Sequence, residues 1–125
     1  MAKTILIVDD SASLRRVVQI ALTGAGYEVI EASDGRDALA KLAKLGGKKV
    51  HLMISDVNMP NMNGIEFVTE VKKDPTYKFT PVIMLTTESD DEVKQEGRVA
   101  GAKAWIVKPF NPSQMLNAVS KLILP

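Results

Sequence analysis

The sequence predicts an α/β protein in which helices cover both faces of a parallel sheet. Five short apolar runs alternate with stretches of helical periodicity. Most of the runs are continuously apolar rather than alternating, as strands buried on both faces require. Because parallel neighbours must be joined by crossovers, this alternation predicts a doubly wound sheet. The predicted strands are residues 4–8, 27–30, 51–54, 81–85 and 104–107.

Two helices are indicated by the spacing of their apolar residues. In residues 14–22, after the first strand, and in residues 115–123, after the fifth, apolar side chains recur at intervals of three and four. Residues 90–100 contain few apolar side chains and an interior glycine, Gly97. We therefore expect this stretch to form the least stable helix and to be a candidate moving part.

Four signals mark the starts of helices. In each, a side chain that can accept a hydrogen bond from a backbone N–H precedes a helix-compatible turn. A proline in the first turn strengthens the last of them, because its missing N–H would be unpaired there in any case. The signals are Asp34 before Gly35, Asn63 with Glu66, residues 89–92, and Asn111 before Pro112.

Length and composition indicate one domain and argue against several classes of protein. The 125 residues predict one domain over residues 1–125 without an output domain, and the hydrophobic fraction of 46% suits helix layers around a buried sheet. A formal net charge of +1, without basic runs, argues against nucleic-acid binding. No stretch is long enough to span a membrane, and the first apolar run ends in two acids, unlike a signal peptide. We expect a cytoplasmic protein that binds neither nucleic acid nor membrane.

Three carboxylates fall where predicted strands end. Asp9 and Asp10 follow the first strand, and Asp56 follows the third. The carboxyl ends of parallel strands share one edge of a sheet, so the three groups should lie close together. Without a cation they would repel one another and raise each other's pKa. The pattern therefore favours a hard cation, and Mg²⁺ fits best because it uses few carboxylates and often bridges to phosphoryl groups.

A cation and a hydroxyl are expected at the same edge. Lys108 ends the fifth strand and Thr86 follows the fourth, so both could contact an anion there. A metal, two donors and a carboxylate make a phosphoryl-transfer site in which positioning and charge neutralisation provide most of the catalysis. Asp56 is the most central acid, and carboxylates can accept phosphoryl groups.

Four motifs in this order resemble the receiver domains of two-component response regulators. They are Asp9-Asp10, residues 56–60 (Asp-Val-Asn-Met-Pro) with Asn63-Gly64, residues 86–88 (Thr-Thr-Glu), and residues 108–110 (Lys-Pro-Phe). The resemblance spans residue 3 to about residue 122, and with nothing appended the chain is similar to the single-domain, CheY-like chemotaxis regulators. It implies a flavodoxin-like fold with five helices and a five-stranded sheet in the order 2-1-3-4-5.

The resemblance also implies a role for each residue of the site. Asp56 would accept a phosphoryl group from the phosphohistidine of a sensor histidine kinase, so the chain would be a self-dephosphorylating phosphoacceptor rather than a conventional enzyme. Mg²⁺ would be held by Asp10, Asp56 and the backbone carbonyl of Asn58, with Asp9 acting through a water. Lys108 would pair with the phosphoryl oxygens, and its bond to the following proline would be cis.

Further positions would control switching and signal lifetime. Thr86 would move toward the phosphoryl group, and Trp105, where relatives mostly carry Tyr or Phe, would change rotamer and remodel an output face. Asn58 and Glu88 would control access of the attacking water and allow self-dephosphorylation within seconds to minutes. The residues expected on the output face are Val93, Arg98, Val99, Lys103, Trp105, Asn117 and Lys121.

A chain of this kind would signal by binding another protein. The resemblance implies the flagellar motor switch as output partner, a phosphatase as a further partner, and a monomeric state. A phosphorelay intermediate, a phosphate sink and a phosphorylation-independent interaction module remain alternatives. An aspartate-nucleophile phosphatase would need an acid where Ser11 stands, and flavodoxin-like carriers and P-loop enzymes need phosphate-binding loops that the sequence lacks.

Overall fold

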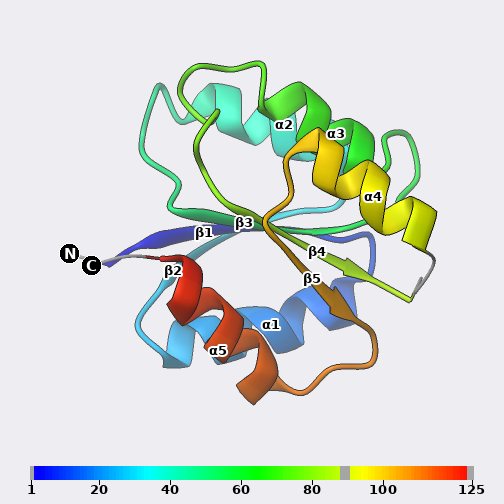
Figure 1. Cartoon of the computed structure of the whole chain (residues 1–125). Helices are drawn as coiled ribbons and strands as arrows, with labels where there is room; N and C mark the ends of the chain where they lie inside the picture. Colours follow the sequence, from blue (N-terminus) through cyan, green and yellow to red (C-terminus); the bar gives the residue numbers. More distant parts are fainter. Residues whose placement is uncertain (1, 88–90, 124–125) are drawn as a thin grey trace.

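The computed structural model describes residues 2–87 and 91–123 and has the predicted doubly wound architecture (Figure 1). Five strands form one parallel sheet in the order β2-β1-β3-β4-β5, so the predicted fold class and strand order are confirmed. The strands are β1 (Thr4–Val8), β2 (Glu28–Ala32), β3 (Leu52–Asp56), β4 (Val82–Thr86) and β5 (Ala104–Val107). The helices are α1 (Ala12–Gly24), α2 (Gly35–Lys44), α3 (Gly64–Val71), α4 (Asp91–Ala100) and α5 (Pro112–Leu122).

The helices form one layer on each side of the sheet. Figure 1 shows α1 and α5 against one face, and α2, α3 and α4 against the other. Successive side chains of a strand point to opposite faces. Accordingly, Ile5 and Ile7 of β1 pack with the α1 and α5 side chains, whereas Leu6 and Val8 pack with those of α2 and α3. Two apolar cores therefore hold the sheet between them.

The central strands are more buried than the edge strands. Every residue of β1, β3 and β4 is buried, as the continuous apolar runs predicted. The edge strands β2 and β5 are buried at one residue each, which explains why Glu28 and Glu31 are tolerated in β2. An edge strand packs against a neighbour on one side only, so part of its surface stays open to solvent.

Three strands end later than their apolar runs do. The sequence predicted residues 27–30, 51–54 and 81–85, whereas β2, β3 and β4 end at Ala32, Asp56 and Thr86. Backbone pairing carries the ladder into these last residues: Ala32 is opposite Val8, and Asp56 is opposite Leu85. The end of a strand depends on backbone hydrogen bonds to its neighbour, which side-chain polarity does not report.

Local hydrogen bonds confirm three of the four helix-start signals. The side chains of Asp34, Asn63 and Asn111 each accept a hydrogen bond from the backbone three residues later, and Asn63 forms a reciprocal capping box with Glu66. The fourth signal, residues 89–92, lies largely outside the described residues. An N-cap that the sequence analysis missed is Ser11, whose hydroxyl accepts from the backbone N–H of Leu14 at 3.2 Å. Among the described residues, no helix is both long and apolar enough to cross a membrane.

Candidate functional site

The three predicted carboxylates meet at the carboxyl edge of the sheet. One oxygen each from Asp9, Asp10 and Asp56 lies within 4.8 Å of the other two. Asp9 follows β1 and is 1% exposed, Asp56 is the last residue of β3 and is 5% exposed, and Asp10 is open to solvent. Carboxylate oxygens are hard ligands of the kind that Mg²⁺ and Ca²⁺ bind in proteins. The donor set therefore fits a divalent cation with one side open to water.

Lys108 bridges the two buried carboxylates of this cluster. Its Nζ lies 3.1 Å from Oδ2 of Asp9 and 3.3 Å from Oδ2 of Asp56. Lys108 follows β5, which is two strands from β3 in the sheet, so its side chain crosses β4 to reach the acids. The Lys108-Pro109 bond is cis, as predicted. One ammonium thus offsets part of the negative charge at the edge of the sheet.

The environment of Asp56 disfavours its charged form. Burial raises the pKa of the Asp56 carboxyl, and the negative charge of Asp9 raises it further. The ion pair with Lys108 and a long hydrogen bond of 3.4 Å from the backbone N–H of Asn58 lower the pKa in part. A carboxylate that is incompletely neutralised is suited to bind a cation and to react with an electrophilic phosphorus.

Hydrogen bonds hold both the carboxylate and the backbone carbonyl of Asp9. Its Oδ1 accepts a hydrogen bond from the backbone N–H of Ser11 at 2.8 Å, and its carbonyl accepts one from Nη1 of Arg15 at 2.6 Å. Arg15 also pairs with Glu31 of β2 at 3.3 Å. Arg15 could not be singled out from the sequence, because its role depends on α1 lying beside β2, which no local pattern indicates.

A glycine allows α3 to start directly beside the reactive strand. A Cβ on Gly64 would stand 2.1 Å from the backbone oxygen of Asp56 and 2.8 Å from Cε of Met84. In the sequence, Gly64 belongs to one of the motifs on which the family resemblance rests, and the motif itself gives no physical reason for a glycine there. The structure supplies one, since only glycine permits this approach to the backbone of β3.

Thr86 and Asn58 lie beside Asp56, as predicted. Thr86 is the fully buried last residue of β4, one position beyond Leu85, which pairs with Asp56. Asn58 is exposed in the loop that follows β3. Glu88, the second residue expected to control water access, lies outside the described residues. The structure therefore brings Asp9, Asp10, Asp56, Asn58, Thr86 and Lys108 to one edge of the sheet.

The sequence of residues 5–120 matches the response regulator receiver domain family. The chain belongs to this family. Chemotaxis protein CheY1 of Helicobacter pylori is 40% identical over 121 residues, which cover 96% of this chain and 95% of that protein. Chemotaxis protein CheY of Thermotoga maritima is 40% identical over 124 residues and 98% of each chain. The structure of chemotaxis protein CheY4 of Vibrio cholerae superposes with a TM-score of 0.91 at 50% identity, covering 98% of this chain and 99% of that one.

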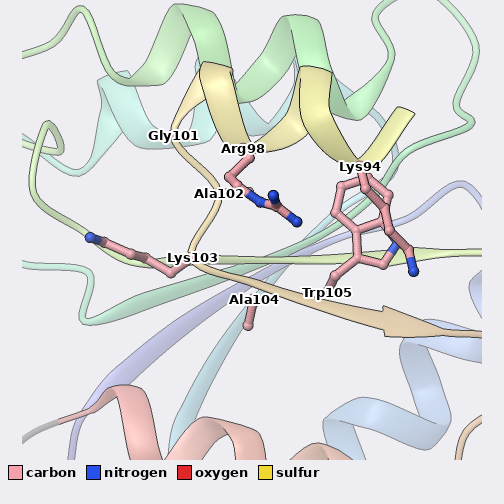
Figure 2. A pocket seen from close by; sticks show the side chains of 7 residues that line it. All are labelled: Lys94, Arg98, Gly101, Ala102, Lys103, Ala104 and Trp105. Atoms are coloured by element: carbon pink, nitrogen blue, oxygen red, sulfur yellow. The ribbon is translucent and has the colours of Figure 1, made fainter. Parts of the chain in front are cut away.

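The receiver domain has a cavity between α4 and β5, on the face expected to give the output signal. Its volume is about 470 Å³, and its lining includes Lys94, Arg98, Lys103 and Trp105. Figure 2 shows the indole of Trp105 rising from β5 toward α4, and the Arg98 side chain extending from α4 into the space beside it. Lys94 and Arg98 lie beside the indole and Lys103 lines the cavity farther along, which gives this receiver domain a basic surface suited to an acidic partner.

Trp105 is held by packing rather than by hydrogen bonds. Its Nε1 is buried and donates to no acceptor among the described residues. The side chain packs against the core cluster on the α2, α3 and α4 side of the sheet. A buried N–H without an acceptor costs free energy, and this cost reduces the preference of Trp105 for the observed side-chain position over others. The remaining residues of the expected output face, Val93, Arg98, Val99, Lys103, Asn117 and Lys121, lie on α4, β5 and α5 or beside them.

Proposed function

We propose that this response regulator receives a phosphoryl group on a carboxylate oxygen of Asp56 from the phosphohistidine of a sensor histidine kinase. The observation that carries the proposal is the paired contact of Lys108 with Asp9 and Asp56 inside a cluster of three carboxylates. In the transfer, an Asp56 oxygen forms a bond to phosphorus as the bond between phosphorus and the imidazole nitrogen breaks. The leaving imidazole then takes a proton and stays on the kinase.

The transfer requires neutralisation of the charge on two anions that approach each other. Bound Mg²⁺ would supply most of it by acting as a Lewis acid that offsets the negative charge of the site and of the incoming phosphoryl group. The residues that would hold the ion are Asp9, Asp10 and Asp56, together with the backbone carbonyl of Asn58. The clustered hard oxygens and the open side at Asp10 support this assignment.

Lys108 and Thr86 would stabilise the product. Lys108 already lies 3.3 Å from Asp56, so its ammonium can exchange the carboxylate oxygen for a phosphoryl oxygen by a small movement. Thr86 would turn its hydroxyl toward the same group from the end of β4. Asn58 and Glu88 would limit how readily water reaches the phosphorus, and they would set a lifetime of seconds to minutes.

The output would pass from Thr86 to Trp105 and the α4-β5-α5 face. Withdrawal of the Thr86 hydroxyl toward the phosphoryl group would free space beside β4, and Trp105 would move into a different rotamer. The basic cavity would then present a changed surface to an acidic segment of the flagellar motor switch. The relatives named as chemotaxis proteins support this choice of pathway. We further propose that the chain acts as a cytoplasmic monomer with a single domain over residues 1–125.

The decisive experiment is intact-mass spectrometry after incubation with acetyl phosphate and Mg²⁺, with Trp105 fluorescence recorded in parallel. We expect the wild type to gain the mass of one phosphoryl group. No gain should occur when EDTA removes Mg²⁺, and none should occur in Asp56→Asn. The fluorescence should change on phosphorylation in the wild type alone. An equal mass gain in Asp56→Asn would refute the assignment of the acceptor. No mass gain with either acetyl phosphate or a phosphorylated kinase would indicate a receiver domain used only for binding.

A further inference from the structure

A second cavity lies at the edge of the sheet opposite to the acidic cluster. The segments that lead into β1, β3 and β4 meet the end of α5 there and enclose a volume of about 530 Å³. The arrowheads of β4 and β5 in Figure 1 point toward the acidic edge, so this cavity is at the other ends of the strands. We call it the basal cleft. Side chains that line it include Lys3, Lys49, His51, Phe79 and Leu122.

The basal cleft has an apolar floor and an exposed aromatic wall. Val50 is buried beneath it, and Pro81, Leu122 and Ile123 contribute partly buried apolar surface. Phe79 is 87% exposed, more than any other large hydrophobic side chain among the described residues. Removal of apolar surface from water is favourable, so a partner that covers this ring would gain hydrophobic free energy.

The rim of the basal cleft is cationic. Lys3 and Lys49 line it, and Nζ of Lys78 lies 5.6 Å from the centroid of the Phe79 ring. Lys49 and Lys78 form no ion pair with any described residue, whereas the neighbouring Lys48 pairs with Glu28 at 3.7 Å. Exposed Lys49 and Lys78, without an acidic partner among the described residues, leave a positive potential over the apolar floor.

The single histidine of the chain, His51, lines the cleft, and the charges of Lys49 and Lys3 act on it. Nδ1 of His51 accepts a hydrogen bond of 3.0 Å from the backbone N–H of Thr4, which fixes the ring at the base of the sheet. Burial lowers the pKa of His51, and the positive charges of Lys49 and Lys3 lower it further. The charges of Lys49 and Lys3 therefore favour a negatively charged group at the rim of the cleft.

We propose that the basal cleft binds an acidic protein segment carrying a large apolar side chain, whether or not Asp56 is phosphorylated. The apolar side chain would lie on the floor against Phe79, and the flanking carboxylates would pair with Lys3, Lys49 and Lys78. Charge complementarity favours an acidic peptide, and the formal net charge of +1 over the whole chain disfavours the broad field that nucleic acid needs.

The position of the cleft explains why this binding would not depend on phosphorylation. β1, β3 and β4 each have five residues, so about 15 Å of rigid strand separates the two edges. The strands are buried throughout and cannot bend without disturbing both cores. A partner in the basal cleft would therefore leave Asp56 accessible to a kinase, and it would act as a tether for the receiver domain.

The proposal can be tested with a capped hexapeptide of sequence Glu-Asp-Glu-Phe-Asp-Glu added to the labelled full chain. Amide and histidine-ring NMR signals should shift saturably at His51, Phe79 and Thr80. Lys49→Glu should weaken binding about fivefold or more, as the loss of one charge contact of about 1 kcal/mol predicts. Phe79→Ser should do the same. Lys44→Glu, an exposed change at the end of α2, is the matched control and should leave the affinity unchanged.

Other outcomes would overturn the proposal. One such outcome is equal affinity of the wild type and Lys49→Glu for the peptide. Another is peptide-induced NMR shifts confined to Lys94, Arg98 and Trp105 on the α4-β5 face. Tighter binding of an oligothymidylate than of the peptide would assign the cleft to nucleic acid instead. Asp56→Asn separates this proposal from the proposed function, because it should block phosphorylation and leave peptide binding unaltered. Amide signals outside the cleft that match those of the wild type verify that the Lys49 and Phe79 variants are folded.

Discussion

Gly97 lies against the indole of Trp105 so closely that a Cβ on the glycine would stand 2.4 Å from Cζ3 of the ring. Figure 2 shows the indole directly below α4, the helix that contains this glycine. An interior glycine weakens a helix, and together with the scarcity of apolar residues it predicts that α4 is the least stable helix. The structure gives Gly97 a second role, since its missing side chain makes the space in which Trp105 lies.

Substitution of Gly97 should therefore reveal a coupling with Trp105. In a Trp105→Ala background, Gly97→Ala should raise the free energy of unfolding by about 0.5–1 kcal/mol, because alanine favours helix. In the wild-type background the same change must displace the indole, so that gain should be absent. Urea denaturation of the four proteins in a double-mutant cycle measures the difference. Equal gains in both backgrounds would show that the contact has no energetic effect.

The raised pKa of Asp56 predicts how stability depends on pH. A carboxyl whose pKa is higher in the folded state disfavours folding once it ionises, so its unfavourable contribution appears as pH rises above 3.8, the usual value for this carboxyl. Asp56→Asn should therefore raise the free energy of unfolding at pH 7 by roughly 1 kcal/mol, a typical effect of one substitution. Lys108 keeps its contact with Asp9 in this variant.

The same comparison at lower pH provides the control for Asp56→Asn. The gain in the free energy of unfolding of Asp56→Asn over the wild type should shrink as pH falls through the folded-state pKa toward 3.8. The wild-type carboxyl then becomes neutral as well. Denaturation curves of both proteins at a series of pH values, without divalent cations, measure this. A gain that does not vary with pH would mean that charge at Asp56 has no part in the effect.

Removal of Lys108 should strengthen cation binding. Lys108→Ala removes a positive charge located 3.1 and 3.3 Å from two carboxylates of the proposed metal site. Less repulsion of the cation should tighten Mg²⁺ binding about fivefold, equivalent to roughly 1 kcal/mol. Isothermal titration calorimetry measures the affinity, with Lys73→Ala as control, since Lys73 pairs with Glu70 on α3 at the surface. Weaker Mg²⁺ binding in Lys108→Ala would indicate that the lysine organises the ligands instead.

Two glycine substitutions of the same kind should differ in their effect on stability. A Cβ at Gly64 would meet the backbone oxygen of Asp56 at 2.1 Å, and backbone cannot move aside as a side-chain end can. Gly64→Ala should therefore lower the free energy of unfolding by about 2 kcal/mol or more. Gly24, the last residue of α1, has nothing within 4 Å, so Gly24→Ala should be neutral or stabilising by up to about 1 kcal/mol. Thermal unfolding of both variants tests the contrast.

The sequence alone was sufficient for the features that depend on local pattern. Continuous apolar runs predicted the buried strands β1, β3 and β4, and the caps at Asp34, Asn63 and Asn111 were readable from short-range chemistry. The site could be predicted as well, because parallel strands place their carboxyl ends at one edge. A motif at the end of each strand therefore becomes a cluster once the fold class is known.

Tertiary structure decided the features that depend on which elements are neighbours. The contact between Asp9 and Lys108 joins residues 99 apart in the sequence. The basal cleft likewise arises between segments distant in the chain. The fit of Trp105 against Gly97 and the support of Asp9 by Arg15 join residues nearer in sequence, but each contact is made between a helix and a strand or its end. Periodicity and capping signals depend on the interactions that a residue makes within its own helix or strand. Close approach and shared charge depend on the surfaces that packing brings together, and only the folded chain determines these.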